Sequence, residues 1–206
     1  MEKNDKIYEG LELLPQDLQG WHGNDPVFRQ LIDKYNPTTI IEVGTWKGQS
    51  AINMAKYCKE TNRETVIYCV DTWLGSSEFL TYNKDKGGRG LHHKNGYPNV
   101  YYQFLSNVVH NKVQDYIIPL PNTSFVGSRV FEYYNIKGDM IYIDASHEEE
   151  AVYQDMGYYL PLVKEGGVLF GDDYKQEQVA RGVKRFCEDN NLEYSVVNKM
   201  HWVIQR

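Results

Sequence analysis

The stretch that decides the fold reads TTIIEVGTWKGQS over residues 38–50. Its first half, residues 38–43, is short, apolar and rich in β-branched side chains, which predicts a buried strand. Gly44 and Gly48 follow at once, and residues 50–58 then carry apolar side chains at helical spacing. A strand that passes through a glycine turn into a helix lets the backbone approach a ligand at the helix N-terminus.

Three interpretations of this glycine turn compete. A phosphate-binding P-loop requires G-x-x-x-x-G-K-[ST], but Gln49 follows Gly48. A dinucleotide fingerprint requires G-x-G-x-x-G, but Trp46 occupies the place of its second glycine. What remains is an acidic strand end followed by G-x-x-x-G. That pattern is either a ligand loop with no phosphate to bind or an ordinary turn between strand and helix.

The rest of the chain repeats the alternation of strand and helix. Further strands are predicted at 66–70, 139–144 and 168–170, and a long helical segment at 148–163. Apolar strands separated by helices predict a doubly wound, mostly parallel α/β sheet covered on both faces. Residues 194–204 read as strand, turn and strand, which predicts an antiparallel edge at the C-terminal end.

We interpret residues 1–206 as a single domain, because this length is usual for one. It begins with a polar lead over residues 1–24. Residues 76–99 have no helical or strand period, and a loop this long in a compact domain is usually functional. We expect it to be a lid that selects the substrate, unless it is merely a solvated turn. Its candidate contact residues are Arg89, His92, His93 and Lys94.

Composition narrows the partners and the compartment. The formal charge of −6 argues against a dedicated nucleic-acid binder. The three cysteines are far apart, which indicates a reducing compartment and argues against a zinc site. No apolar run has the length of a signal peptide or a membrane span, so we expect a cytoplasmic protein without membrane contact. The 17 Tyr and four Trp suit a ligand cleft or a subunit interface, which leaves a homo-oligomer open.

An acidic residue closes the second predicted strand. Asp71 follows Gly48 by about 20 residues, the spacing at which doubly wound folds place the acid that binds a ribose diol. A lone Asp after a strand is otherwise commonly a cap or turn residue. The glycine turn and the acid together favour a ligand that contains a ribose.

With these features the chain resembles the class I S-adenosylmethionine-dependent methyltransferases, which have a Rossmann-like fold. EVGTWKG at 42–48 is similar to their first motif, and VDTW at 70–73 to their second. IDASH at 143–147 and GGVLFGDDY at 166–174 resemble a narrower group. That group comprises the macrocin-type sugar O-methyltransferases and the cephalosporin hydroxylase-like proteins. The resemblance covers roughly residues 20–185.

The resemblance implies a binding site for S-adenosylmethionine (SAM) at the strand ends. Residues of the first motif would contact the methionine and sugar end, residues 71–73 the ribose and adenine edge, and residues 122–124 the adenine. The implied cofactor-binding residues are Glu42, Gly44, Thr45, Trp46, Gly48, Ser50, Asp71, Thr72, Trp73, Asn122, Thr123, Ser124 and Asp144.

Three acidic residues follow neighbouring strands. Asp144 ends one predicted strand, and Asp172 and Asp173 end the next, so their strands lie about 5 Å apart in a parallel sheet. Carboxylates this close repel unless a cation or a proton separates them. Oxygen ligands without cysteine suit a hard cation, Mg²⁺ first and Ca²⁺ or Mn²⁺ after it. In the resembling enzymes these positions hold a divalent ion that binds the substrate's oxygens. The alternative is that the acids cap a helix or contact the cofactor.

His147 is the candidate general base. Ser146 to Glu149 fit a capping box, which predicts Ser146 as the N-cap and His147 in the first helical turn, facing the cleft. Beside Asp144 and a methyl donor, His147 would take the proton of the acceptor hydroxyl, or would only orient it. An exposed His at a helix start is otherwise commonly without function.

The function predicted from these residues is O-methylation of a small hydroxylated acceptor, such as a sugar or glycoside. Asp144 and His147 are its candidate catalytic residues. The alternative is a hydroxylase-like or non-catalytic SAM-binding protein on the same fold.

Overall fold

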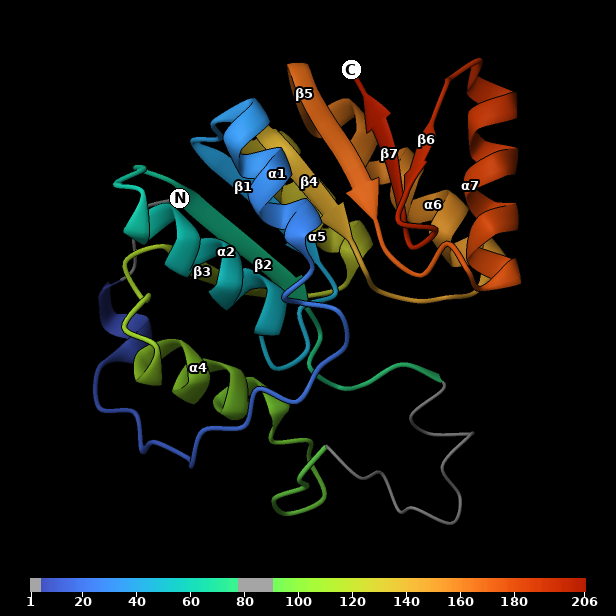
Figure 1. The fold of residues 1–206 in the computed structure, drawn as a ribbon. Coiled ribbons are helices and arrows are strands. Elements are labelled where there is room, and N and C mark those ends of the chain that lie inside the picture. The colour runs from blue at the N-terminus through green and yellow to red at the C-terminus, as the bar shows by residue number, and fades with distance from the viewer. Residues whose placement is uncertain (1–4, 78–90) are drawn as a thin grey trace.

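The structure is a computed structural model that describes residues 5–77 and 91–206. Its centre is a seven-stranded sheet of order β3-β2-β1-β4-β5-β7-β6 (Figure 1). The first five strands pair in parallel, and β7 is antiparallel to both β5 and β6. The predicted doubly wound sheet with an antiparallel C-terminal edge is therefore confirmed. The strands are β1 (Thr39–Val43), β2 (Val66–Asp71), β3 (Ile117–Pro121), β4 (Gly138–Ile143), β5 (Val163–Gly171), β6 (Ser195–Val197) and β7 (His201–Gln205).

Helices cover both faces of the sheet. One apolar cluster joins α1, α2 and α4 to one face, and a second joins α5, α6 and α7 to the other. None of the described helices is long and apolar enough to cross a membrane. The helices are η1 (Asp5–Tyr8), α1 (Pro26–Tyr35), α2 (Gln49–Glu60), α4 (Val100–His110), α5 (Ser124–Tyr133), α6 (Glu149–Tyr159), η2 (Leu160–Leu162) and α7 (Glu177–Asn190).

The direction of winding reverses between β1 and β4. From β1 the chain adds β2 and β3 on one side of the sheet, and from β4 it adds β5 on the other. The loops that leave β1 and β4 therefore diverge, and ligands of open α/β sheets bind in the crevice that opens there. The side chains of β1 alternate between the faces: Ile40 belongs to the first apolar cluster, and Ile41 and Val43 to the second. Because β1 is a central strand, its side chains are buried on both faces of the sheet.

The helix after β4 begins later than the sequence predicts. Glu148 is the N-cap of α6, and the Ser146 hydroxyl accepts the Glu148 N–H at 3.4 Å. This bond spans two residues, as in a serine turn, so Ser146 shapes the loop and does not cap the helix. The capping box was therefore a wrong prediction, and His147 lies in the loop before α6 and not in its first turn.

Only part of the predicted lid lies in the described chain. Leu91 is fully buried in the first apolar cluster, and its carbonyl accepts the Asn99 N–H at 2.8 Å. The end of the 76–99 segment is thus packed against the protein. Arg89 lies outside the described residues. The lid stays a prediction.

The N-terminal segment is bound to α4 by buried polar side chains. We call residues 11–24 the strap; it has no helix or strand and runs past α4 before it enters α1 (Figure 1). The Leu14 N–H donates to Ser106 Oγ at 3.0 Å, and Asn107 both accepts the Asp17 N–H and donates to its carbonyl. Gln103 donates to the Pro15 carbonyl at 2.8 Å. Residues 11–24 of the polar lead are therefore an integral part of the fold.

At the amino end of the sheet, one carboxylate joins three strands. Asp139 of β4 accepts the N–H groups of Thr38 and Thr39 at 2.9 Å, just before and at the start of β1. It also pairs with Lys164 of β5 at 2.9 Å. Although burial raises the pKa of Asp139, the hydrogen bonds from Lys164, from the Thr39 N–H and from the Thr38 hydroxyl hold it below its ordinary value.

We expect Asp139→Ala to destabilise the protein by about 1–3 kcal/mol, because the N–H groups at the start of β1 lose their acceptor. Since the pKa of Asp139 is lowered on folding, its contribution is present at neutral pH and is lost as the pH falls through the folded pKa. Urea unfolding at pH 7 measures the loss. Asp115→Ala, at an exposed carboxylate in the turn before β3, is the control; equal midpoints for the two variants would contradict the prediction.

Candidate functional site

A cleft of about 820 Å³ opens at the carboxyl ends of β1, β2, β4 and β5. Its size is that of a pocket for a cofactor or a small molecule. Most of the predicted site residues line it. These are Gly44, Thr45, Trp46, Ser50, Asp71, Thr72, Asn122, Thr123, Ser124, Asp144, His147, Asp172 and Asp173.

Asp71 holds the two loops that frame one side of the cleft. One of its carboxylate oxygens accepts the N–H groups of Thr45 at 2.9 Å and Trp46 at 2.8 Å. The other accepts the Trp73 N–H at 2.7 Å. Burial raises the pKa of Asp71, and these N–H groups offset part of that rise. The acid predicted to bind a ribose thus also fixes the shape of the glycine turn.

Gly44 is required by a close approach of two backbones. Its φ of +86° lies in the left-handed region, and a Cβ placed there would lie 2.0 Å from the carbonyl oxygen of Asp144. Any other residue would force the turn after β1 away from the turn after β4. The glycine therefore sets how closely the two halves of the cleft approach each other.

Three predicted cofactor-binding residues lie beneath the lining of the cleft and not in it. Gly48 packs against the ring of Phe104, which a Cβ at this position would approach to 2.7 Å. Trp73 is buried, and its indole N–H donates to the Trp46 carbonyl at 2.7 Å. Glu42 is fully buried within β1. In this structure these residues support the wall that their neighbours form.

The buried Glu42 carboxyl is surrounded by weak donors. It accepts hydrogen bonds from the hydroxyls of Ser50 and of Thr45, and contacts the Cys69 thiol at 3.7 Å. Burial, opposed by the hydrogen bond from Ser50 and aided by the charge of Asp144, raises the pKa of Glu42 to about 8. Glu42 is therefore protonated at neutral pH, and the base of the cleft is less negative than its composition suggests.

The register of β4 and β5 brings the acidic cluster together. Ile143 pairs with Gly171, so Asp144 and Asp172 follow directly opposed residues. The side chain of Asp172 is only 2% exposed. Burial and the charges of Asp144 and Asp173 raise the pKa of Asp172 to about 6. The cluster therefore concentrates negative charge in a place where water screens it poorly.

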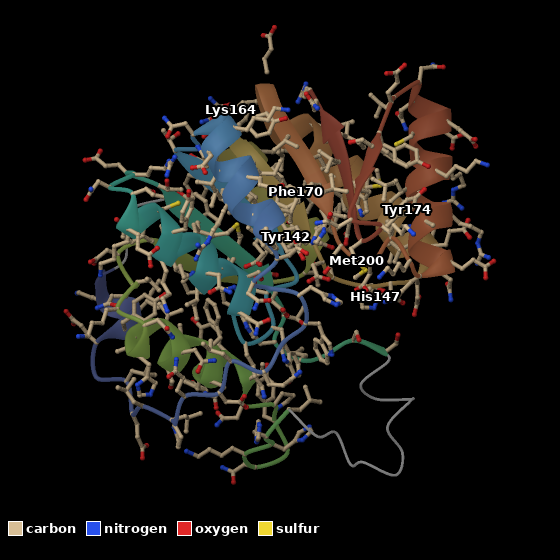
Figure 2. The ribbon with its side chains drawn as sticks, viewed as in Figure 1. Tyr142, His147, Lys164, Phe170, Tyr174 and Met200 are labelled. Atoms are coloured by element: carbon tan, nitrogen blue, oxygen red, sulfur yellow. The ribbon has the colours of Figure 1, made fainter. Side chains whose placement is uncertain are left out.

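Two histidines face these acids from different segments. His147 Nε2 lies 2.9 Å from Asp173 Oδ2 and 3.9 Å from Asp144 Oδ1. His22 Nδ1, from the strap, lies 3.4 Å from Asp172 Oδ2. Although burial raises the pKa of Asp173, the hydrogen bond with His147 brings it below the ordinary value. Figure 2 shows His147 at the carboxyl end of the sheet, opposite Lys164 at the other end.

These side chains form two groups that could hold a metal ion. One contains Asp144, His147 and Asp173, and the other contains His22, Asp172 and Asp173. Within each group, the ligand atoms lie within 4.8 Å of one another. Of the predicted metal residues, Asp173 belongs to both groups, Asp144 to one and Asp172 to the other, and each group also includes a histidine.

A third histidine lies behind Asp172. His201 of β7 is fully buried, and in the described chain neither of its ring nitrogens has a hydrogen-bond partner. Its Nε2 lies 3.6 Å from Asp172 Oδ1, which is too long for a hydrogen bond. Burial lowers the pKa of His201, so a neutral imidazole stands beside the acidic cluster.

Sequence reasoning missed the part of the cleft that the strap provides. Trp21 and His22 line the cleft, together with Gln49 and Gln176 at the starts of α2 and α7. The ring of Trp21 lies 6.4 Å from that of Trp46. The one local signal is that glycines flank Trp21 and His22. A Cβ on the second of them, Gly23, would lie 2.7 Å from the Ser50 nitrogen.

The fold and this site define a methyltransferase of the doubly wound class. The family model described as a methyltransferase domain matches residues 41–174, from β1 through the acidic cluster. The chain belongs to this methyltransferase family. No curated protein matches the sequence significantly.

Solved structures share the fold at low sequence identity. The O-methyltransferase NovP superposes with a TM-score of 0.65 and 17% identity, over 89% of this chain and 79% of that chain. The O-methyltransferase TomG from Streptomyces achromogenes, in complex with SAM, gives 0.62 and 13% over 92% and 82%. An O-methyltransferase from Bacillus cereus, in complex with SAH, gives 0.58 and 15% over 98% and 88%. At these identities the likeness is one of fold.

We expect the buried Glu42 to make the protein less stable as the pH rises from about 5 to 8. In this range the folded Glu42 keeps its proton, because its pKa is raised from 4.5 to about 8, whereas the unfolded chain releases it. Glu42→Gln, which resembles the protonated acid, should remove this part of the pH dependence. Urea midpoints of both proteins at pH 5 and pH 8 measure the difference. The same loss of stability in both proteins would show that Glu42 is ionised in the fold.

Proposed function

We propose that the protein transfers the methyl group of SAM to a hydroxyl oxygen of a small acceptor, such as a sugar or glycoside, with a divalent cation at the acidic cluster. The observation that carries the proposal is that one cleft contains the glycine turn, Asp71 and the acidic cluster. Membership of the methyltransferase family supports the reaction class. Two structures of the same fold, described as complexes with SAM and with SAH, support the choice of donor.

The cofactor would lie along the glycine turn. Thr45 and Trp46 would face its methionine and ribose. The Asp71 carboxylate, already fixed by backbone N–H groups, would accept hydrogen bonds from the ribose hydroxyls. Residues 122–124, at the start of α5, would contact the adenine. In this arrangement the sulfonium would lie toward Asp144, on the side of the cleft where the acidic cluster lies.

The residues present fit a divalent cation. Asp144, Asp172 and Asp173 offer the oxygens, and burial together with their crowding raises the pKa of Asp172, as expected for buried carboxylates without a compensating charge. The ring of His201 is buried beside Asp172 without a hydrogen-bond partner among the described residues, which is a second observation in favour of a bound ion or water at this site. When bound, the cation would supply a Lewis acid that lowers the pKa of the acceptor hydroxyl.

The protein's own chemical task is to align the acceptor and remove its proton. The acceptor oxygen forms the new bond to the methyl carbon while the bond from that carbon to sulfur breaks and leaves SAH. A neutral His147 that donates its Nε2–H to Asp173 would take the acceptor proton at Nδ1. Asp173 would then stabilise the imidazolium, and Asp144 would orient the acceptor beside it. Holding donor and acceptor in line reduces the entropic cost of the reaction.

For the cofactor site, we expect Asp71→Ala to weaken SAH binding about tenfold to a hundredfold. The variant loses both the acceptor for the ribose and the anchor of the Thr45 and Trp46 N–H groups. Isothermal titration calorimetry with SAH measures it, with Asp33→Ala, at a surface carboxylate of α1, as the control. Failure of the wild type to bind SAH would refute the proposed function.

For the base, we expect His147→Ala to lower methyl transfer about 10²–10⁴-fold, the usual contribution of a positioned base. His147→Gln keeps a hydrogen-bonding group that accepts no proton at neutral pH, so it should be nearly as slow. SAH binding should be unchanged in both variants. Transfer of labelled methyl from SAM to a panel of sugar and glycoside hydroxyls measures the rates. If His147→Gln kept most of the activity, His147 would only orient the acceptor.

A further inference from the structure

The strap brings a second histidine, His22, to the acidic cluster. His22 Nδ1 lies 3.4 Å from the deeply buried Asp172, and His22, Asp172 and Asp173 can bring one ligand atom each within 4.8 Å of one another. The side chain of His22 is 49% exposed, whereas that of Asp172 is 2% exposed. A half-exposed histidine in an ordinary surface ion pair contributes little to stability. Its place above a buried carboxylate therefore calls for another explanation.

The strap is fixed on both sides of His22 by the amide side chains of α2. Gln49 accepts the Gly23 N–H at 3.1 Å and donates to the Leu18 carbonyl at 3.2 Å. Asn53 donates to the Gly23 carbonyl at 2.8 Å. The φ of His22 itself is +51°, a left-handed conformation that few residues with a side chain adopt. The backbone is thus held in the conformation that directs the imidazole at Asp172.

A second, independent observation indicates a ligand at this place. The ring of His201 is fully buried on the other side of Asp172, and its nitrogens have no hydrogen-bond partner among the described residues. Buried polar atoms without a partner are rare in folded proteins, and a bound ion or water commonly explains them. Asp172 therefore lies between His22 and His201 in a region that is not satisfied by the protein alone.

We propose that His22 is a ligand of the divalent cation and that the ion fastens the strap over the cleft. This inference rests on the metal of the proposed function and adds to it a nitrogen ligand from a segment outside the parallel sheet. Carboxylates alone suit Mg²⁺, Ca²⁺ and Mn²⁺, whereas an imidazole favours first-row transition metals. A site with both kinds of ligand selects Mn²⁺ over Mg²⁺.

The ligand role of His22 also links the metal to the acceptor side of the cleft. Trp21 precedes His22, is 58% exposed and lines the cleft near Trp46. Fixing His22 on the ion would hold the Trp21 ring as a wall of the space beside the methyl donor. Metal binding would thus order a surface on which a ring of the acceptor can pack.

The test is Mn²⁺ binding by the whole protein, followed by electron paramagnetic resonance with pulsed detection of coupled ¹⁴N. In the wild type we expect bound Mn²⁺ with imidazole nitrogen coupling. His22→Ala should raise the dissociation constant at least about tenfold, the lower limit seen when even an outer-shell partner of a metal is removed. It should also lose nitrogen coupling and the preference for Mn²⁺ over Mg²⁺. Asp115→Ala, at an exposed carboxylate outside both metal groups, should behave as the wild type.

Two further measurements separate ligation from a structural effect. His22→Gly removes the imidazole and relieves the left-handed φ, so a folded His22→Gly protein with weak Mn²⁺ binding assigns the loss to the ring. Hydrogen exchange of residues 18–24 should slow on addition of Mn²⁺ in the wild type but not in His22→Gly. Wild-type binding and nitrogen coupling that persist in both His22 variants would overturn the inference and leave the metal site intact. A wild type that binds neither Mn²⁺ nor Mg²⁺ would overturn the metal site as well.

Discussion

The whole arrangement depends on the pairing of β1 with β4 and on its continuation for one residue beyond the strands. Val43 pairs with Ile143, and the Asp144 N–H then donates to the Val43 carbonyl at 2.8 Å. Gly44 donates in the same way to the Val70 carbonyl of β2 at 2.8 Å. Because a side chain at Gly44 would collide with the Asp144 carbonyl, the two loops can separate only after this point. The cleft exists because the backbones are so close at its base.

The cleft collects acidic residues, and the protein compensates each of them differently. Glu42 is buried beyond the reach of water and keeps its proton. Asp71 accepts hydrogen bonds from backbone N–H groups, which offset part of the rise that burial causes in its pKa. Asp172 accepts a single backbone N–H in the described chain, that of Asp173 at 2.7 Å, and its other neighbours are the imidazoles of His22 and His201 and the carboxylates of Asp144 and Asp173. Functional sites commonly contain groups that are unfavourable for stability, and the buried Asp172, close to two other carboxylates, is such a group.

The sequence was sufficient for the elements whose signals are local. β1, β2 and β4 are short β-branched runs that each end at an acid or a glycine, so both the sheet and the position of the cleft were predictable. β3 was not, because Pro119 and Pro121 interrupt the pattern of a strand; they are tolerated because β3 is an edge strand.

The strap was beyond prediction for a different reason. It has no period of its own, and its order comes from polar side chains of α4 such as Gln103 and Asn107, about 90 positions further along the chain. Without that contact His22 is one more polar residue of an N-terminal lead. The predicted start of α6 was wrong for a more local reason. The same short sequence fits both a serine turn and a capping box, and the geometry of the loop after β4 decides between them.

The attachment of the strap has a consequence for the order of events during synthesis. The strap leaves the ribosome before α4, so the Leu14 N–H has no acceptor until Ser106, 92 residues later, has been made. Until α4 has been made, the backbone around Asp17 has no partner there, and the buried Lys47 of the glycine turn lacks its counterion, Asp17. Closing so long a loop carries an entropic cost that the sheet must first offset. The part of the cleft wall that the strap provides can therefore form only after α4 has been made, although the strap precedes α4 in the chain.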